Sequence, residues 1–150
     1  MKRPWFLVLL AGLLVAAGVP KKDEALQKEL ERMAGTWAVV AHEVGGQKQN
    51  KEMVEQANVR LIVKGTKYIV FFGEQQVTQG TLKLDPTAKP KTIDAVADDG
   101  PTKGEAMPGI YELEGDSMRV VFAQPGEPRP TEFRTRAGTN QIMIQYKRVK

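Results

Sequence analysis

The spacing of hydrophobic positions changes twice along this chain of 150 residues. An unbroken apolar run begins at Trp5, close to the N-terminus. Residues 20–34 then carry Leu26, Leu30 and Met33 at helical spacing, which predicts one short amphipathic helix. Beyond this helix, apolar residues recur at every second position, as they do in strands with one buried face. The pattern predicts an apolar leader, a helix and a β-rich remainder.

The β-rich part contains eight or nine alternating runs, joined by turns rich in Gly, Asp and Pro. Residues 51–57 fit one or two helical turns, but no helix separates the later runs, which excludes βαβ units. We therefore predict an antiparallel eight-stranded up-and-down barrel, with a β-sandwich as the alternative. The runs are residues 36–42, 59–64, 68–72, 76–84, 91–97, 107–113, 118–122 and 141–148, with 131–135 as a further extended segment.

The start of the first run resembles the Gly-x-Trp opening of lipocalins, because Gly35-Thr36-Trp37 directly follows the predicted helix. In lipocalins the Trp plugs the closed end of the barrel and packs under a basic residue from near the last strand. The resemblance implies a lipocalin-like barrel and structural roles for Gly35 and Trp37. It leaves three candidates for the basic partner: Arg134, Arg136 and Arg148.

A longer resemblance covers residues 26–148. In their order, four segments resemble an uncharacterised lipocalin-like domain family that is abundant in planctomycete bacteria: Gly80–Pro86, Pro90–Asp94, Gly109–Asp116 and Arg129–Phe133. Members of that family often carry a secretion signal, and no established activity comes with the resemblance. Many members have a Cys after the Gly-Asp hairpin, where this chain has Val121 or Phe122, so a shared thiol function is not expected here.

The N-terminus has the three parts of a secretory signal peptide. Lys2 and Arg3 precede the apolar run, and small residues follow it. The run is roughly 15 residues long, short of the ~20 that cross a bilayer, so an uncleaved membrane anchor is the lesser alternative. We predict cleavage after Ala17 or Gly18 and a periplasmic or secreted location. The chain then divides into a signal peptide (1–18), a helix (19–35) and a barrel domain (36–150).

Composition and charge exclude several classes of function. The chain has no cysteine, and therefore no disulfide, thiolate metal site or cysteine nucleophile. Its formal charge is +4, but two of the 22 basic residues lie in the leader, which leaves 20 basic against 18 acidic residues, or +2. A charge this small does not predict binding to a nucleic-acid backbone.

The sequence offers no arrangement of residues typical of catalysis or metal binding. His42 is the only histidine, and the alternation puts its neighbour Glu43 on the opposite face, so a surface or edge position is favoured. Ser117 lacks the Gly-x-Ser-x-Gly setting of a hydrolase nucleophile. An enzyme that uses barrel carboxylates and Tyr111 for acid–base catalysis is the least favoured function, because no sequence spacing points to a pair of residues that could act as acid and base. We predict no enzyme, metal or cofactor, and read three acids as solvated turn residues: Asp94, Asp98 and Asp99.

The open question is whether the barrel interior is filled or hollow, since eight-stranded barrels occur in both forms. A hollow barrel would make the protein an exported, non-enzymatic lipocalin-like module that binds a small apolar or amphipathic ligand. A filled barrel would make it a scaffold or an interaction domain for a protein partner in the cell envelope. A membrane would be a partner only if the leader is uncleaved. The predicted cavity lining consists of Trp37, Tyr68, Phe72, Tyr111, Met118 and Phe122.

Overall fold

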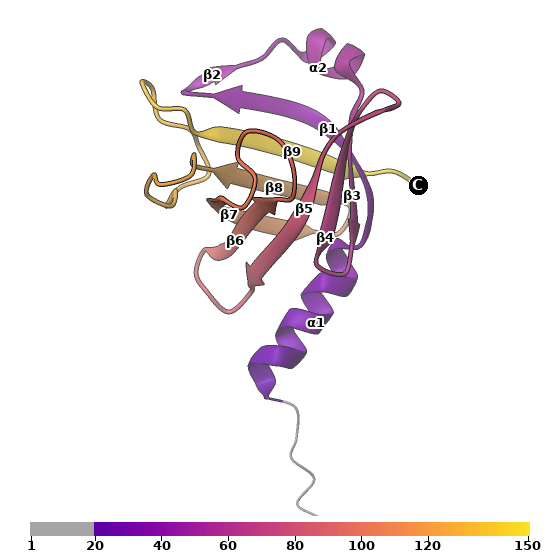
Figure 1. Ribbon diagram of the computed structural model, residues 1–150, viewed down its shortest axis with the longest axis vertical. Coiled ribbons are helices and arrows are strands. Elements are labelled where there is room, and N and C mark those ends of the chain that lie inside the picture. The colour runs from indigo at the N-terminus through magenta and orange to yellow at the C-terminus, as the bar shows by residue number, and fades with distance from the viewer. Residues whose placement is uncertain (1–19) are drawn as a thin grey trace, which may run out of the picture.

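The computed structural model describes residues 20–150, so the predicted signal peptide at residues 1–18 lies outside the described part. This part of the chain contains two helices and nine strands (Figure 1). Neither of these helices is long and apolar enough to span a membrane. In chain order the elements are α1 (Lys21–Met33), β1 (Gly35–Val44), β2 (Gln47–Lys48), α2 (Lys51–Ala57), β3 (Val59–Lys64), β4 (Lys67–Phe72), β5 (Gln75–Asp85), β6 (Lys91–Ala97), β7 (Ala106–Glu114), β8 (Ser117–Phe122) and β9 (Ile142–Arg148).

Eight of the strands, β1 and β3 to β9, close into one antiparallel barrel. From β3 onward each strand pairs with the next, and β1 pairs with both β3 and β9, which closes the ring. The two-residue β2 extends the sheet beside the end of β1. The predicted up-and-down barrel is therefore confirmed. The β-sandwich alternative is wrong, because a sandwich would consist of two sheets and not one closed ring.

A bulge in β1 changes which of its side chains face inward. The register between β1 and β9 slips between Val39 and Ala41, which leaves Val40 as an extra residue. An unbroken alternation would have put Ala41 on the same face as Val39. After the bulge, His42 instead pairs with the inward-facing Ile144, so His42 faces the barrel interior. It is half-buried there, which corrects the prediction of a surface or edge histidine.

The helix α1 closes one end of the barrel. It ends just before β1, and its apolar stripe places Leu30 and Met33 in the same buried cluster as the strands, with Leu26 packed against it. The Trp37 indole Nε1 donates a hydrogen bond to the Met33 carbonyl oxygen at 2.9 Å. In Figure 1, α1 and α2 lie at opposite ends of the barrel. A helix this short needs such docking to be stable.

The long connection between β8 and β9 packs on the outside of the barrel. Its predicted extended segment at 131–135 is not a strand. Pro130 lacks a backbone N–H, and Arg129 fixes the connection by pairing with Asp94 at 2.8 Å and donating to the Gly109 carbonyl at 2.8 Å. A second, smaller apolar cluster lies beneath this connection and consists of Ile110, Val121, Met143 and Phe133.

Candidate functional site

The barrel interior is solid in the half next to α1. There solvent reaches at most 8% of any inward-facing core residue. Side chains packed to this degree leave no room for a ligand. We call this the filled half; its inward-facing strand residues are Trp37, Leu61, Val63, Tyr68, Leu82, Leu84, Ile93, Tyr111, Leu113, Met118, Val120 and Tyr146.

In the other half, the inward-facing residues are all partly or fully exposed. The strand registers show that further side chains on each strand face inward beyond the core, but these side chains are no longer buried. These side chains point into the ring in the half away from α1, toward the end where α2 lies (Figure 1). We call this the open half; its inward-facing residues are Val39, His42, Val44, Val59, Val70, Phe72, Gln75, Thr78, Ala95, Ala97, Met107, Phe122, Ile142 and Ile144.

The predicted cavity lining is divided between the two halves. Alternation identified the inward face correctly, but it carries no information about depth along the barrel axis. Phe72 stands at the mouth with 52% of its surface exposed, and Phe122 packs against the edge of the core. Of the six predicted residues, Trp37, Tyr68, Tyr111 and Met118 lie in the filled half, and Phe72 and Phe122 lie in the open half.

Polar groups meet the open half where it adjoins the core. Thr78 faces inward and donates a hydrogen bond to the Asp99 carboxylate at 3.2 Å. Burial and the carboxylates of Asp98 and Asp99 raise the pKa of Tyr68, whose ring lies against Gly80, so its hydroxyl stays protonated.

Sequence reasoning missed two polar groups that alternation could have found. Thr78 shares the inward phase of Gly80 and Leu82 on β5, and the β4–β5 register slips only beyond it, which leaves Val77 as the extra residue. Tyr146 likewise falls on the apolar phase of the last strand. Burial and the nearby phenol of Tyr68 raise the pKa of Tyr146. Both tyrosines are buried in the filled half.

His42 contributes an uncharged imidazole to the open half. Burial lowers its pKa, and the Gln49 side chain opposes this effect. Its Nδ1 atom is enclosed and has no hydrogen-bonding partner among residues 20–150. The adjacent Glu43 points to the outer face, where its carboxylate accepts hydrogen bonds from the backbone N–H and the hydroxyl of Thr135 at 3.0 and 2.7 Å. These contacts hold the pKa of Glu43 below its usual value.

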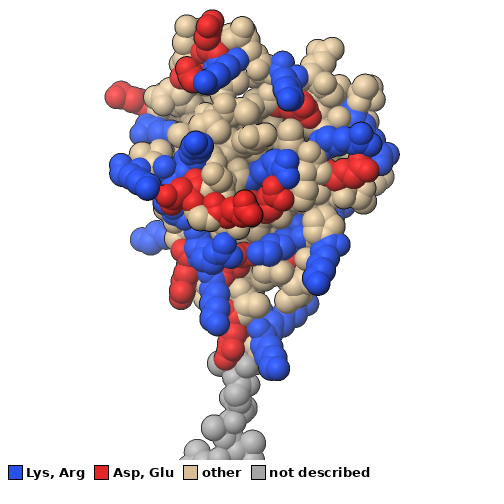
Figure 2. All heavy atoms as spheres, turned by 180° about the vertical axis from the view of Figure 1, so that it is seen from behind, with Lys and Arg blue, Asp and Glu red and all other residues tan. Residues whose placement is uncertain are grey.

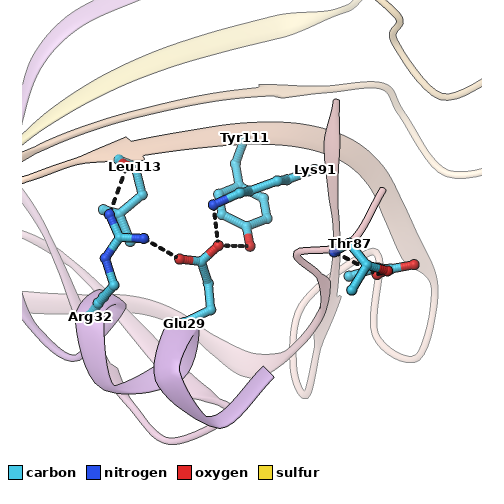
Figure 3. Close-up of polar contacts among 7 residues, drawn as sticks. Glu29, Arg32, Thr87, Lys91, Tyr111 and Leu113 are labelled. Atoms are coloured by element: carbon cyan, nitrogen blue, oxygen red, sulfur yellow. Dashed lines mark hydrogen bonds and ion pairs between the residues drawn. The ribbon is translucent and has the colours of Figure 1, made fainter. Parts of the chain in front are cut away.

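A buried carboxylate fastens α1 to the closed end (Figure 3). Glu29 is 3% exposed, and its Oε2 accepts hydrogen bonds from the Lys91 ammonium at 2.6 Å and the Tyr111 hydroxyl at 2.8 Å. Its Oε1 pairs with Arg32 at 2.9 Å, and Arg32 also donates to the Leu113 carbonyl at 3.0 Å. Burial and Glu29 raise the pKa of Tyr111. The contacts of Tyr111 thus serve helix docking.

Arg148 is the basic residue that packs on Trp37. Its Cζ lies 4.3 Å from the centroid of the Trp37 ring. Gly35 has φ +126°, a backbone conformation that favours glycine, and a Cβ there would come within 2.8 Å of the Arg148 guanidinium. The other two candidates lie elsewhere: Arg134 is exposed and pairs with Glu132 at 2.5 Å, and Arg136 is exposed in the β8–β9 connection.

Within residues 20–150, neither the distribution of surface charge (Figure 2) nor a cluster of metal-binding side chains indicates another functional site. Figure 2 shows Lys and Arg interspersed with Asp and Glu over the face seen from behind. Asp94 is on the outer face and pairs with Arg129, whereas Asp98 and Asp99 are exposed after β6. Within residues 20–150, no group of three or more His, Asp or Glu side chains could hold a metal ion.

No protein-family model and no curated protein matches this chain. What the fold and the site define is a closed antiparallel barrel whose interior is buried at the end covered by α1 and partly exposed at the other. The resemblance to the lipocalin-like family of planctomycete bacteria stays a prediction.

Proposed function

We propose that this protein is a non-enzymatic binding module that holds a small apolar or amphipathic ligand in the open half of its barrel. One observation carries the proposal: inward-facing apolar residues change from buried to partly exposed halfway along a single closed barrel. A ligand that removes apolar side chains such as Val39, Val70 and Ile144 from water lowers the free energy of the complex. In this proposal the buried core of the filled half stabilises the fold, and the apolar side chains of the open half contact the ligand.

We also propose that the module works outside the cytoplasm. The two basic residues, the apolar run and the small residues of the first 18 positions support this, as does the resemblance to a family whose members often carry secretion signals. The intact mass of protein purified from the envelope of the source organism tests it. A chain beginning at Gly18 or Val19 supports export with cleavage, and a full-length chain in the soluble cytoplasmic fraction contradicts it.

Titration with 1-decanol, followed by native mass spectrometry and calorimetry, tests binding. The variant Ala95→Phe places a ring in the open half, whereas Val96→Phe places the same ring on the outer face of the same strand. We expect one decanol per wild-type chain, loss of binding in Ala95→Phe and retention in Val96→Phe. Absence of binding in the wild type, or equal binding in both variants, would contradict the proposal and favour the interaction-domain alternative.

A further inference from the structure

The β8–β9 connection, residues 123–141, folds around a cleft of about 460 Å³ on the outer side of the barrel. This volume lies within the range of ~300–1,000 Å³ that is typical of small-molecule sites. Two arms of the connection line the cleft: the first comprises residues 123–134, and the second comprises residues 136–141. The cleft is separate from the barrel interior, because its lining residues all lie in the connection and none lies in a strand.

Three contacts fix the two arms in place. Arg129 fastens the first arm to the barrel wall with an ion pair at 2.8 Å. Between the arms, the buried Thr135 donates hydrogen bonds from its backbone N–H and its hydroxyl to the Glu43 carboxylate at 3.0 and 2.7 Å. The Gln124 side-chain amide donates to the Asn140 carbonyl at 3.2 Å and so joins the first arm to the second. A cleft held in this way is preformed, so a ligand does not have to order its walls.

The lining of the cleft contains one unpaired charge of each sign. It includes three arginines and two glutamates. Arg129 pairs with a carboxylate of β6 at 2.8 Å, and Arg134 pairs with Glu132 at 2.5 Å. The other two charged residues, Arg136 and Glu127, are exposed and form no ion pair within residues 20–150, not even with each other. The cleft therefore offers a cation on one arm and an anion on the other.

The backbone that carries Arg136 is fixed on both sides. Its N–H donates to the Gln141 side-chain oxygen at 2.9 Å, and its carbonyl accepts from the Thr139 hydroxyl at 2.6 Å. A guanidinium presents a planar fork of N–H groups that matches a carboxylate. The carboxylate of Glu127 matches an ammonium group, which has three hydrogens to donate and a positive charge.

We propose that this cleft is a second binding site and that its ligand is a small zwitterion of the amino-acid or short-peptide class. The carboxylate of the ligand pairs with Arg136, and its ammonium group pairs with Glu127. A ligand with only a negative charge would be repelled by Glu127, and one with only a positive charge would be repelled by Arg136. The proposal goes beyond the proposed function and does not depend on it, because the ligand lies outside the barrel.

A series of glycine peptides tests the proposal, because each added residue increases the separation of the two charges. Glycine, diglycine, triglycine and tetraglycine are titrated into the ¹⁵N-labelled protein at pH 6.5, below the ordinary α-amino pKa of about 7.7–8.0. We expect at least one of them to cause saturable NMR shifts in residues 123–141. The N-acetyl and C-terminal amide derivatives of that peptide should each bind about three- to fivefold more weakly, as the loss of one partly screened ion pair allows.

Two variants assign each end of the ligand. With Arg136→Gln, the peptide and its C-terminal amide should bind equally, and with Glu127→Gln, the peptide and its N-acetyl derivative should bind equally. The controls Lys83→Gln and Glu74→Gln remove exposed charges outside the cleft and should leave every affinity unchanged.

The proposal would be overturned if no member of the series bound, or if the blocked peptides bound as tightly as the free one. Unchanged affinities in Arg136→Gln and Glu127→Gln would overturn it as well. None of these outcomes affects the proposed function of the barrel interior, which decanol binding tests separately.

Discussion

The guanidinium of Arg148 covers the indole ring of Trp37 at 4.3 Å and donates hydrogen bonds to two main-chain oxygens at the end of α1. These oxygens belong to Ala34 and Arg32, at 2.6 and 2.5 Å respectively. One side chain from the last strand thus fixes the helix, the first strand and the indole that fills the base of the barrel. This contact, together with the contacts of Glu29 with Lys91, Tyr111 and Arg32, holds α1 on the closed end of the barrel.

Arg148→Ala should lower the free energy of unfolding by about 2 kcal/mol, because it removes a cation–π contact and two charged hydrogen bonds. Urea unfolding followed by Trp37 fluorescence measures this in protein that begins after the leader. Arg136→Ala is the matched control, because Arg136 is exposed and contacts neither Trp37 nor α1. Equal stabilities of the two variants would show that the contact does not hold the closed end.

Glu29→Gln should also destabilise the fold by about 2 kcal/mol, because Lys91 and Arg32 would lose their shared carboxylate; their exposure to solvent keeps the loss below that of a fully buried pair. Glu31→Gln changes an exposed carboxylate on the same helix and should have an effect within 0.5 kcal/mol, as is usual for surface substitutions. Chemical unfolding of both variants at neutral pH decides the matter. A loss as large in Glu31→Gln would assign the effect to helix charge and not to docking.

His42 should make the stability depend on pH in the weakly acidic range. Its pKa in the folded protein lies below the ordinary 6.5, so the unfolded chain binds the proton more readily. The free energy of unfolding should therefore be constant above pH 7 and should fall as the pH drops below 6.5. Unfolding of the wild type and His42→Gln between pH 5.5 and 7.5 measures the difference. Parallel curves would mean that the imidazole is not desolvated in the folded state.

Small-to-large substitutions should distinguish the two halves of the interior. Val120→Phe forces a ring into packed core and should cost about 1–3 kcal/mol. Ala95→Phe adds a larger group, yet should leave the free energy of unfolding unchanged or raised, because its ring enters solvent-accessible space and covers apolar neighbours. Thermal and urea unfolding of both variants provide the comparison. A comparable loss in Ala95→Phe would mean that the open half is already packed.

Much of the fold follows from local pattern. The alternating runs, the turns between them and the helical stripe were enough to predict a closed barrel preceded by a helix, and the resemblance of Gly35-Thr36-Trp37 to the lipocalin opening implied that Trp37 lies at the closed end. The two bulges were not predictable, because Val40 and Val77 continue a plausible alternation. The bulge at Val40 has the consequence that His42 faces inward, and the bulge at Val77 places Gln75 opposite the inward-facing Phe72.

The division of the barrel interior into a filled and an open half could not be predicted from the sequence either. Val39 and Val70 in the open half are the same residue type as Val63 and Val120 in the filled half, and all four fall on inward phases. Their burial depends on how far each strand continues beyond the core and on which end α1 covers. Both are properties of the tertiary structure, and the alternation of hydrophobic residues along a strand carries no information about them.

The most direct test of the account follows the methyl groups of Ile, Leu and Val by NMR while 1-decanol is added to the protein. We predict saturable shifts for Val39, Val70 and Ile144 in the open half, and none for Val63 and Val120 in the filled half. No shifts at saturating decanol, or shifts confined to the outer cluster of Ile110 and Val121, would contradict the claim that the open half of the barrel is a binding site.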